Sequence, residues 1–168
     1  PDLERLSKIA KKHKLFLIED SSDTIGGTIN NHPTGYYSDI STTSFYGSHI
    51  ITAAGAGGII CVNKEEWNRK ARILRGWGRS SAIDESEDIK KRFKVRLNNI
   101  SYDSKFIFEA IGYNFLPSEI SAAFGLVQLK KLKNFAEIRQ RNFKQLFNFF
   151  STYDYFSLPK QLPQVKTS

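Results

Sequence analysis

A short, uninterrupted apolar run at residues 15–18, which ends in Glu19 and Asp20, constrains the fold of this chain more than any other feature of its sequence. Such a run is typical of a parallel strand that is covered on both faces of its sheet. Before it, residues 2–13 carry apolar side chains at helical spacing, namely Leu3, Leu6, Ile9 and Ala10. We therefore expect a helix and then a buried strand with two acids at its carboxyl end.

Further periodic segments extend this pattern into an α/β fold. Residues 40–46 and 57–63 are expected to form strands, and residues 64–75 a helix. Alternating helices and strands predict a mostly parallel sheet with flanking helices. Residues 78–104 are polar and show weak periodicity, so we expect a long surface excursion there.

The last third of the chain is predicted to be helical. A Pro-Ser-Glu sequence at residues 117–119 is typical of a helix start, and an apolar stripe follows over residues 120–133. Residues 134–150 are expected to form another long helix, and the proline-containing residues 157–168 a linker. Because the chain begins without methionine, we interpret it as a segment of a longer protein.

Charge and hydropathy narrow the classes of partner. The net charge of +8 would suit nucleic acid, but the basic residues alternate with acids or with apolar helix positions. No nucleic-acid-binding signature is present, so we expect no nucleic-acid partner. The sequence has no apolar run of 18 or more residues, and we expect no membrane span.

The single cysteine, Cys61, limits the redox and metal chemistry of this chain. One thiol excludes an internal disulfide and any metal site built from several cysteines of the chain, and we expect no metal site. Cys61 lies in the apolar residues 58–62, so we predict that it is a small, buried core residue.

Three stretches carry residues with useful chemistry, and the first is residues 19–23. Asp20 follows the first predicted strand, at the edge where open α/β sheets bind their ligands. A carboxylate there can hold a protonated ring nitrogen or a metal ion. From the residues alone, a solvated or helix-capping carboxylate is the more common role.

The second stretch, residues 42–49, contains Ser44 and ends in His49, just before a glycine-rich segment. Hydroxyls and backbone amides near glycines suit a phosphate, and an imidazole can act as a general base or acid. A structural histidine is equally compatible with this pattern and more common. The third stretch, residues 111–115, places Asn114 before a helix, either in a mere turn or as an amide presented to an anion.

Taken in order, these stretches resemble the sugar aminotransferase family called DegT/DnrJ/EryC1/StrS, from Asp2 to about Phe150. The resemblance implies the aspartate-aminotransferase fold of enzymes that use pyridoxal 5′-phosphate (PLP). Residues 1–156 would then be part of the large, cofactor-binding domain, and residues 157–168 a linker toward a missing C-terminal domain. The family also implies an upstream part that supplies a phosphate-binding turn and a side chain that stacks on the cofactor ring.

The resemblance implies a role for each candidate residue. Asp20 matches the carboxylate that pairs with the pyridine nitrogen and keeps the ring protonated as an electron sink. Asp23 lies near the ring's phenolic oxygen, where the family often has glutamine. Ser44 matches the serine that binds the cofactor phosphate, and Asn114 an asparagine that reaches a phosphate across a dimer interface. A homodimer of the full-length protein is therefore expected.

Five residues after Ser44, the family's aminotransferases have the lysine that holds PLP covalently, and this sequence has His49. An imidazole cannot make that link. The same exchange marks the sugar 3-dehydratases, which use pyridoxamine 5′-phosphate (PMP), and residues 75–79 and 91–93 are also similar to theirs. The likeness implies His49 as the catalytic residue of a PMP- or PLP-dependent C3 dehydration.

One branch of these dehydratases, the CDP-6-deoxy-L-threo-D-glycero-4-hexulose-3-dehydrases, holds an iron–sulfur centre with a cysteine cluster between these two motifs. Residues 80–90 of this sequence contain no cysteine. Because a [2Fe–2S] centre needs about four cysteine ligands, we expect no iron–sulfur cluster. The motifs are most similar to those of this CDP-sugar branch, but without the cysteines the protein would be either a cluster-free dehydratase, like those of GDP-linked sugars, or an enzyme of an adjacent reaction.

The implied substrate is a nucleotide-linked 4-keto-6-deoxyhexose, used in deoxysugar synthesis for lipopolysaccharide or O-antigen. Such a substrate class implies a cytoplasmic location. Two alternatives stay open: a PLP-dependent nucleotide-sugar aminotransferase, and a family relative that binds cofactor or sugar without catalysis. The fragment alone is expected to bind cofactor poorly and to have little activity.

Overall fold

The computed structural model describes residues 1–83 and 88–167 of the chain. Residues 84–87 belong to the predicted surface excursion and Ser168 to the predicted linker, and both lie outside the described residues. The chain divides into two compact units. One consists of residues 1–61 and 117–168, and the other of residues 62–116.

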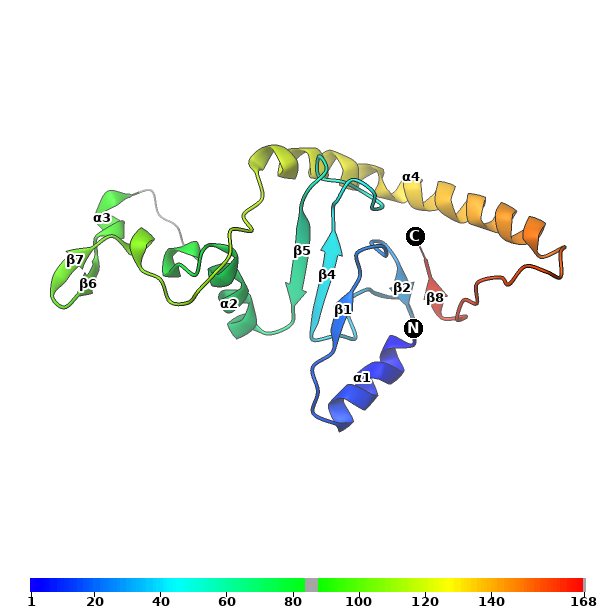
Figure 1. Cartoon of the computed structure of the whole chain (residues 1–168), viewed down its shortest axis with the longest axis horizontal. Coiled ribbons are helices and arrows are strands. Elements are labelled where there is room, and N and C mark those ends of the chain that lie inside the picture. The colour runs from blue at the N-terminus through cyan, green and yellow to red at the C-terminus, as the bar shows by residue number, and fades with distance from the viewer. Residues whose placement is uncertain (84–87, 168) are drawn as a thin grey trace. The chain divides into compact units, whose positions relative to one another are not determined.

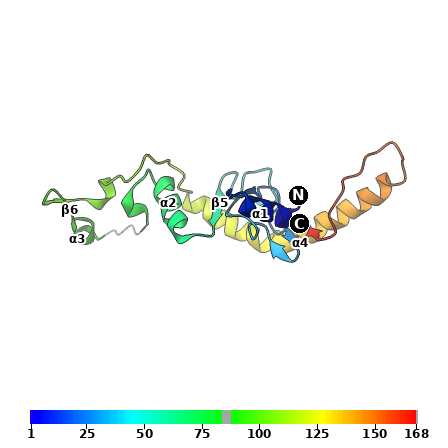
Figure 2. The ribbon, with the colours of Figure 1, turned by 90° about the horizontal axis from the view of Figure 1, so that it is seen from below.

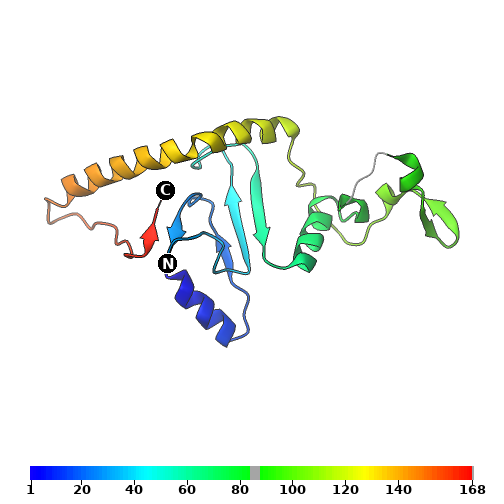
Figure 3. The ribbon, with the colours of Figure 1, turned by 180° about the vertical axis from the view of Figure 1, so that it is seen from behind.

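The first unit is built on a three-stranded sheet in the order β1-β4-β5. β1 (Ile18–Asp20) pairs in parallel with β4 (Ile40–Ser44), as the sequence predicts. β5 (Gly58–Val62) lies on the other side of β4 and runs in the opposite direction (Figures 1 and 3). The predicted helix before the sheet is α1 (Leu3–Lys12), and the side chain of Asp2 caps its first turn.

A second small sheet of this unit has the order β3-β2-β8. β2 (Thr28–Ile29) pairs in antiparallel fashion with both β3 (His32–Pro33) and β8 (Val165–Lys166). The predicted linker therefore ends in a strand that pairs with the body of the unit. The N-terminus and β8, the last strand of the chain, lie near each other in this unit (Figures 1 and 2). The connection of residues 157–168 to a further domain stays a prediction.

The two helices predicted near the end of the chain are one continuous helix, α4 (Glu119–Phe150), of 32 residues. At 1.5 Å per residue it is about 48 Å long. The predicted division at residue 134 is wrong because an asparagine costs a helix well under about 1 kcal/mol, too little to end it. The start is as predicted: the Ser118 side chain accepts a hydrogen bond from the backbone N–H of Ser121.

The prediction that the first strand and Cys61 are buried is wrong. Phe16 and Ile18 expose 68% and 65% of their surface, and Cys61 is exposed as well. The physical reason is the size of the sheet. Because β1 and β5 are the outer strands of only three, their apolar side chains lie at the edges of a small sheet. Among the described residues, the buried apolar side chains of the first unit are Leu3, Ala10, Ile29, Ile51 and Ala53, and that of the second unit is Ile73.

The second unit begins with α2 (Glu65–Arg75), the helix predicted at residues 64–75. Regular structure also occurs in and at the end of the predicted excursion, namely η1 (Ser80–Ala82), α3 (Ile89–Arg92), β6 (Val95–Leu97), β7 (Ile100–Tyr102) and η2 (Ser104–Phe106). β6 and β7 form a hairpin around Asn98 and Asn99, whose φ angles are 49° and 66°. Asparagine tolerates this left-handed backbone, which two-residue hairpin turns require. This Asn-Asn turn between two apolar runs is the signal that would have predicted the hairpin.

An ion pair fixes the hairpin within this unit. The guanidinium of Arg92 in α3 donates to both carboxylate oxygens of buried Asp103, and the backbone N–H of Lys105 donates to one of them at 2.9 Å. The hydrogen bond from Arg92 is the main reason that the pKa of Asp103 lies below its ordinary 3.8, and the backbone N–H adds to it.

We expect the protection of the hairpin amides to fall when the solution is acidified from about pH 5 to about pH 2. The folded-state pKa of Asp103 is depressed, so its stabilisation is present above the unfolded-state value and is lost as the pH falls through the folded-state value. Hydrogen-exchange protection factors of the amides in β6 and β7 measure this. In Asp103→Asn the acid-dependent part should vanish, and an unchanged pH profile in that variant would contradict the prediction.

Among the helices that the structure describes, none combines the length and the apolar character needed to cross a membrane.

Candidate functional site

The acid-containing and hydroxyl-containing stretches meet at one edge of the first sheet. The parallel register places Asp20 beside Thr42, at the carboxyl ends of β1 and β4. Beyond the strands, the backbone N–H of Ser21 donates to the carbonyl of Thr42 at 2.8 Å, and the hydroxyl of Thr43 donates to the carbonyl of Ser21 at 2.9 Å. Residues 20 to 23 and residues 44 to 49 therefore leave the same sheet edge, where ligands of open α/β sheets bind.

Glu19 is buried and serves the structure of this edge. Its carboxylate accepts hydrogen bonds from the Ser21 hydroxyl at 2.7 Å, the Gly35 backbone N–H at 2.9 Å and the Ser38 hydroxyl at 3.2 Å. At Gly35, with φ of 88°, a Cβ atom would lie 2.4 Å from the hydroxyl oxygen of Ser41, so only glycine fits there. Glu19 was not among the predicted site residues. Because Glu19 and Asp20 are consecutive in a strand, their side chains face opposite sides of the sheet.

Asp20 points to the other side of β1 and is exposed. Its Oδ1 atom accepts from both the hydroxyl and the backbone N–H of Ser22. The Ser22 hydroxyl is the largest cause that lowers the pKa of Asp20 below its ordinary 3.8, and the Ser22 backbone N–H is the second. Desolvation, the third-largest cause, raises this pKa, and the interaction with His49, the smallest, lowers it. At neutral pH Asp20 is therefore a carboxylate, ready to accept a hydrogen bond from a cation.

Ser44 is the last residue of β4, and its hydroxyl oxygen accepts from the backbone N–H of Tyr46 at 3.2 Å. That bond uses the oxygen as an acceptor, so the hydroxyl proton can be donated outward, for example to a phosphate. His49 follows in the turn after the strand, where its backbone N–H donates to the carbonyl of Tyr46 at 3.1 Å. Its imidazole lies edge-on to the Tyr46 ring, with centroids 6.4 Å apart.

The imidazole of His49 is paired with Asp23. Its Nδ1 atom lies 2.7 Å from Oδ1 of Asp23. The His49 side chain exposes 21% of its surface and that of Asp23 exposes 80%. The structure thus brings together Asp23 and His49, which are 26 positions apart in the sequence and were predicted as separate site residues.

Asn114 belongs to the other unit. It forms an isolated bridge with Gly76, and the neighbouring backbone N–H of Tyr113 donates to the carbonyl of Leu74 at 2.7 Å. These contacts tie the segment to the end of α2. The four residues Asp20, Asp23, Ser44 and His49 lie in the first unit, and Asn114 is described with the second.

A cavity of about 610 Å³ opens beside the acidic segment of the first unit. Asp20, Asp23 and Thr24 line it, together with the cationic residues Arg139 of α4 and Lys166 of β8. Its volume falls in the range of ordinary small-molecule sites, about 300–1,000 Å³. Within residues 1–83 and 88–167, no group of three or more metal-ligating side chains is found.

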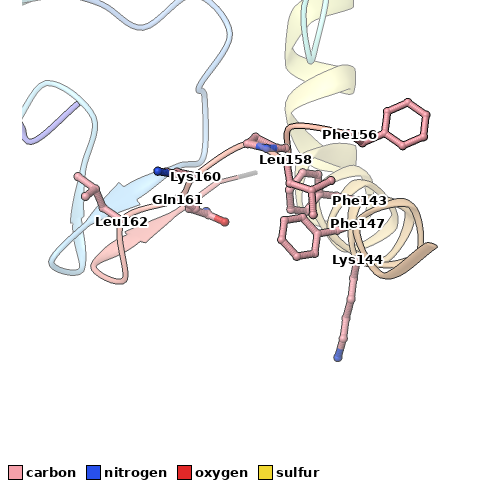
Figure 4. A pocket seen from close by; sticks show the side chains of 9 residues that line it. Phe143, Lys144, Phe147, Phe156, Leu158, Lys160, Gln161 and Leu162 are labelled. Carbon is pink, nitrogen blue, oxygen red and sulfur yellow. The ribbon is translucent and has the colours of Figure 1, made fainter. Parts of the chain in front are cut away.

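A second cavity of the same unit is lined mostly by apolar side chains and has a volume of about 950 Å³. Figure 4 shows Phe143 and Phe147 of α4 beside Leu158 of the tail, with Lys144 extending away from them. The residues that line it include none of the five candidates named from the sequence.

Comparison with known proteins matches the chain to curated relatives over most of its length. It is 36% identical over 169 residues to dTDP-4-dehydro-2,6-dideoxy-D-glucose 3-dehydratase of Saccharopolyspora spinosa, covering 98% of this chain and 36% of that protein. It is also 36% identical over 149 residues to the lipopolysaccharide biosynthesis protein RfbH of Salmonella typhimurium, covering 86% of the chain and 34% of that protein. The chain therefore spans about a third of the length of these relatives. Other relatives include transaminases of nucleotide-linked sugars.

Solved structures give the same result for the fold. GDP-4-keto-6-deoxy-D-mannose-3-dehydratase of E. coli with bound hydrated PLP superposes with a TM-score of 0.80 at 27% identity, over 96% of this chain and 40% of that one. The predicted fold, a part of the PLP-dependent aminotransferase fold, is confirmed. The sequence model of the DegT/DnrJ/EryC1/StrS aminotransferase family matches residues 1–167. The chain, with the sheet edge that carries Asp20 and Ser44, therefore belongs to that family.

Proposed function

We propose that this chain is part of a PMP- or PLP-dependent enzyme that dehydrates C3 of a nucleotide-linked 4-keto-6-deoxyhexose in deoxysugar synthesis. The observation that carries this proposal is the contact of the His49 imidazole with Asp23. The resemblance implies that residue 49 is where the family's aminotransferases have their lysine. An imidazole can move protons but cannot hold the cofactor covalently. A dehydratase needs the first ability and not the second.

The side chains present fit the implied cofactor. Asp20 is a carboxylate with a lowered pKa, as a partner of a protonated ring nitrogen should be. Ser44 has a hydroxyl proton to donate to the cofactor phosphate, and we propose Asn114 for the same phosphate from across a dimer interface. PMP, when bound, supplies an amine that captures the substrate's keto group and a ring that takes up electrons.

Each residue then has a stated task. Asp20 keeps the ring nitrogen protonated, which favours electron flow into the ring. We propose that Asp23 lies near the phenolic oxygen of the ring. With the cofactor and substrate bound, His49 would be the residue that takes a proton from the C4′ carbon and gives a proton to the departing C3 hydroxyl. Imidazole suits both steps because it exchanges protons near neutral pH.

The relatives support the substrate class. Two carry names of dehydratases that act on dTDP- or GDP-linked sugars, and a third the name of a lipopolysaccharide biosynthesis protein. The cavity beside Asp20 is lined by both signs of charge, with Arg139 and Lys166 among the acids Glu19, Asp20 and Asp23. We further propose a homodimer, a reaction without an iron–sulfur cluster, and residues 1–156 as part of a cofactor-binding domain.

A cofactor-retention experiment tests the proposal. The full-length protein that contains this chain is incubated with PLP or with PMP, the excess is removed, and absorbance spectra are recorded before and after borohydride. We expect PMP to be retained and PLP to leave no borohydride-trapped protein adduct. The matched control is His49→Lys, which restores an amine and should give a trapped adduct with PLP at residue 49.

The outcomes separate the alternatives. A trapped adduct in the unaltered chain would make an aminotransferase the better assignment. Retention of PMP without release of water from a 4-keto-6-deoxyhexose nucleotide would favour a non-catalytic relative. Retention of neither cofactor would contradict the proposed cofactor site.

A further inference from the structure

We propose that Asp23 is a positioning residue that fixes the tautomer and the orientation of the His49 imidazole, so that Nε2 is the atom that moves protons. The mechanistic consequence rests on the proposed function, whereas the tautomer does not. The two can therefore be tested apart.

The contact itself defines which ring nitrogen carries the proton. Oδ1 of Asp23 lies 2.7 Å from Nδ1 of His49, within the usual range of a charge-assisted hydrogen bond. An ionised carboxylate only accepts hydrogen bonds, so Nδ1 must be the donor and carry a hydrogen. In the neutral ring, Nε2 then has the free lone pair. Unconstrained histidine prefers the opposite tautomer, and the pair therefore changes the proton distribution of this ring.

Both partners sit on short turns that the backbone closes. In the Asp23 turn, the backbone N–H and the hydroxyl of Thr24 donate to the carbonyl of Ser21, at 3.1 and 3.3 Å. In the His49 turn, the backbone N–H of His49 donates to Tyr46, whose ring also borders the imidazole. The backbone of Ser21 is also hydrogen-bonded to β4, so both turns begin at the same pair of strands. The carboxylate that contacts the imidazole is therefore held in place by its turn.

The high exposure of Asp23 indicates that the pair of His49 and Asp23 contributes little to the stability of the fold. Asp23 exposes 80% of its side chain, and an exposed pair of this kind contributes little to folding. The loss of the carboxylate should therefore leave the chain folded. This separates a positioning role from a merely structural one, because the ring chemistry should change while stability does not.

The test measures the tautomer of His49 directly. The chain has three histidines, so long-range ¹H–¹⁵N spectra of the ¹⁵N-labelled full chain contain few imidazole signals, and the His49→Ala spectrum identifies those of His49. At a pH where the ring is neutral, we expect hydrogen on Nδ1 in the unaltered chain. In Asp23→Ala we expect it to move to Nε2. Asp23→Asn retains an acceptor oxygen and should keep most of the Nδ1-protonated form.

A distant carboxylate provides the control. Asp154→Ala removes the same charge from an exposed position after α4 and should leave the His49 spectrum unchanged. An Nε2-protonated ring in the unaltered chain would overturn the proposal, as would the same tautomer in the unaltered and the Asp23→Ala chains. A change of tautomer in Asp154→Ala would also count against it, since the effect would then not be specific to Asp23.

The kinetic arm depends on the proposed reaction. In the holoenzyme, Asp23→Ala should lower kcat for dehydration by about tenfold to a hundredfold, a fraction of a whole acid–base contribution, with a much smaller change in KM. Asp23→Asn should recover part of the loss. If the tautomer follows Asp23 and no dehydration is found in the unaltered enzyme, the positioning role stands and the proposed function fails. If dehydration proceeds and the tautomer ignores Asp23, the proposed function stands and the positioning role fails.

Discussion

His49→Ala is expected to lower the rate of sugar dehydration by about 10²- to 10⁴-fold, the usual contribution of a general acid–base group. The variant loses the only group that we propose to take the C4′ proton and to protonate the departing hydroxyl. PMP binding should be nearly unchanged, since Asp20 and Ser44 do not depend on the imidazole for their hydrogen bonds with Ser22 and Tyr46. Release of the dehydrated sugar, followed by mass spectrometry, measures the rate, and retained absorbance measures the cofactor.

His13 provides the matched control for this change. It is exposed and follows the last turn of α1, so His13→Ala removes an imidazole of similar kind away from the sheet edge. We expect normal turnover in that variant. Normal turnover in His49→Ala would mean that another group moves the protons, and the dehydratase assignment would lose its main support.

Asp20→Asn is expected to reduce turnover on the order of a hundredfold, comparable with the loss of one preorganised electrostatic contact in other enzymes. An amide keeps the size and the hydrogen-bonding capacity of the side chain but has no charge to hold the ring nitrogen protonated. The pKa of Asp20 lies below its ordinary value because of Ser22, so the carboxylate is charged throughout the neutral range in the unaltered chain. The effect should therefore be the same at all pH values from about 6 to 8.

Bound PMP reports the same change without turnover. Its absorbance and fluorescence depend on protonation of the ring nitrogen, and we expect them to differ between Asp20→Asn and the unaltered holoenzyme. Asp154→Asn is the control, with the same chemical change at an exposed turn. Identical spectra and rates in Asp20→Asn would place Asp20 outside the cofactor site.

The sequence predicted the class of fold because apolar periodicity and strand order depend on local patterns. The helix before the first strand, the strands β1 and β4 and the start of α4 after Ser118 all follow from short stretches of residues. Burial did not follow in the same way. Whether Phe16 or Cys61 is covered depends on how many strands and helices surround the sheet, which a local pattern does not specify.

The candidate site shows the same division. Asp20, Ser44 and His49 were named from their place after predicted strands, and the resemblance gave each a role that remains a proposal. The contact between His49 and Asp23 was not predicted, since it joins two turns through side chains 26 residues apart. The role of Glu19 was also missed, because two of its three hydrogen-bond donors, Gly35 and Ser38, come from a loop whose conformation no short pattern specifies.

A strand repeats every two residues, and β1 uses this repeat to give two consecutive acids unlike surroundings. Exchange of Glu19 and Asp20 with one another would preserve length, composition and net charge. It would nevertheless put the shorter acid among the hydrogen-bond donors of the 35–38 loop and the longer one beside Ser22. The order of the two acids, and not only their presence, therefore determines the hydrogen bonds at this sheet edge. A sequence comparison that counts only carboxylates at these two positions would not detect an exchange that alters the contacts of both side chains.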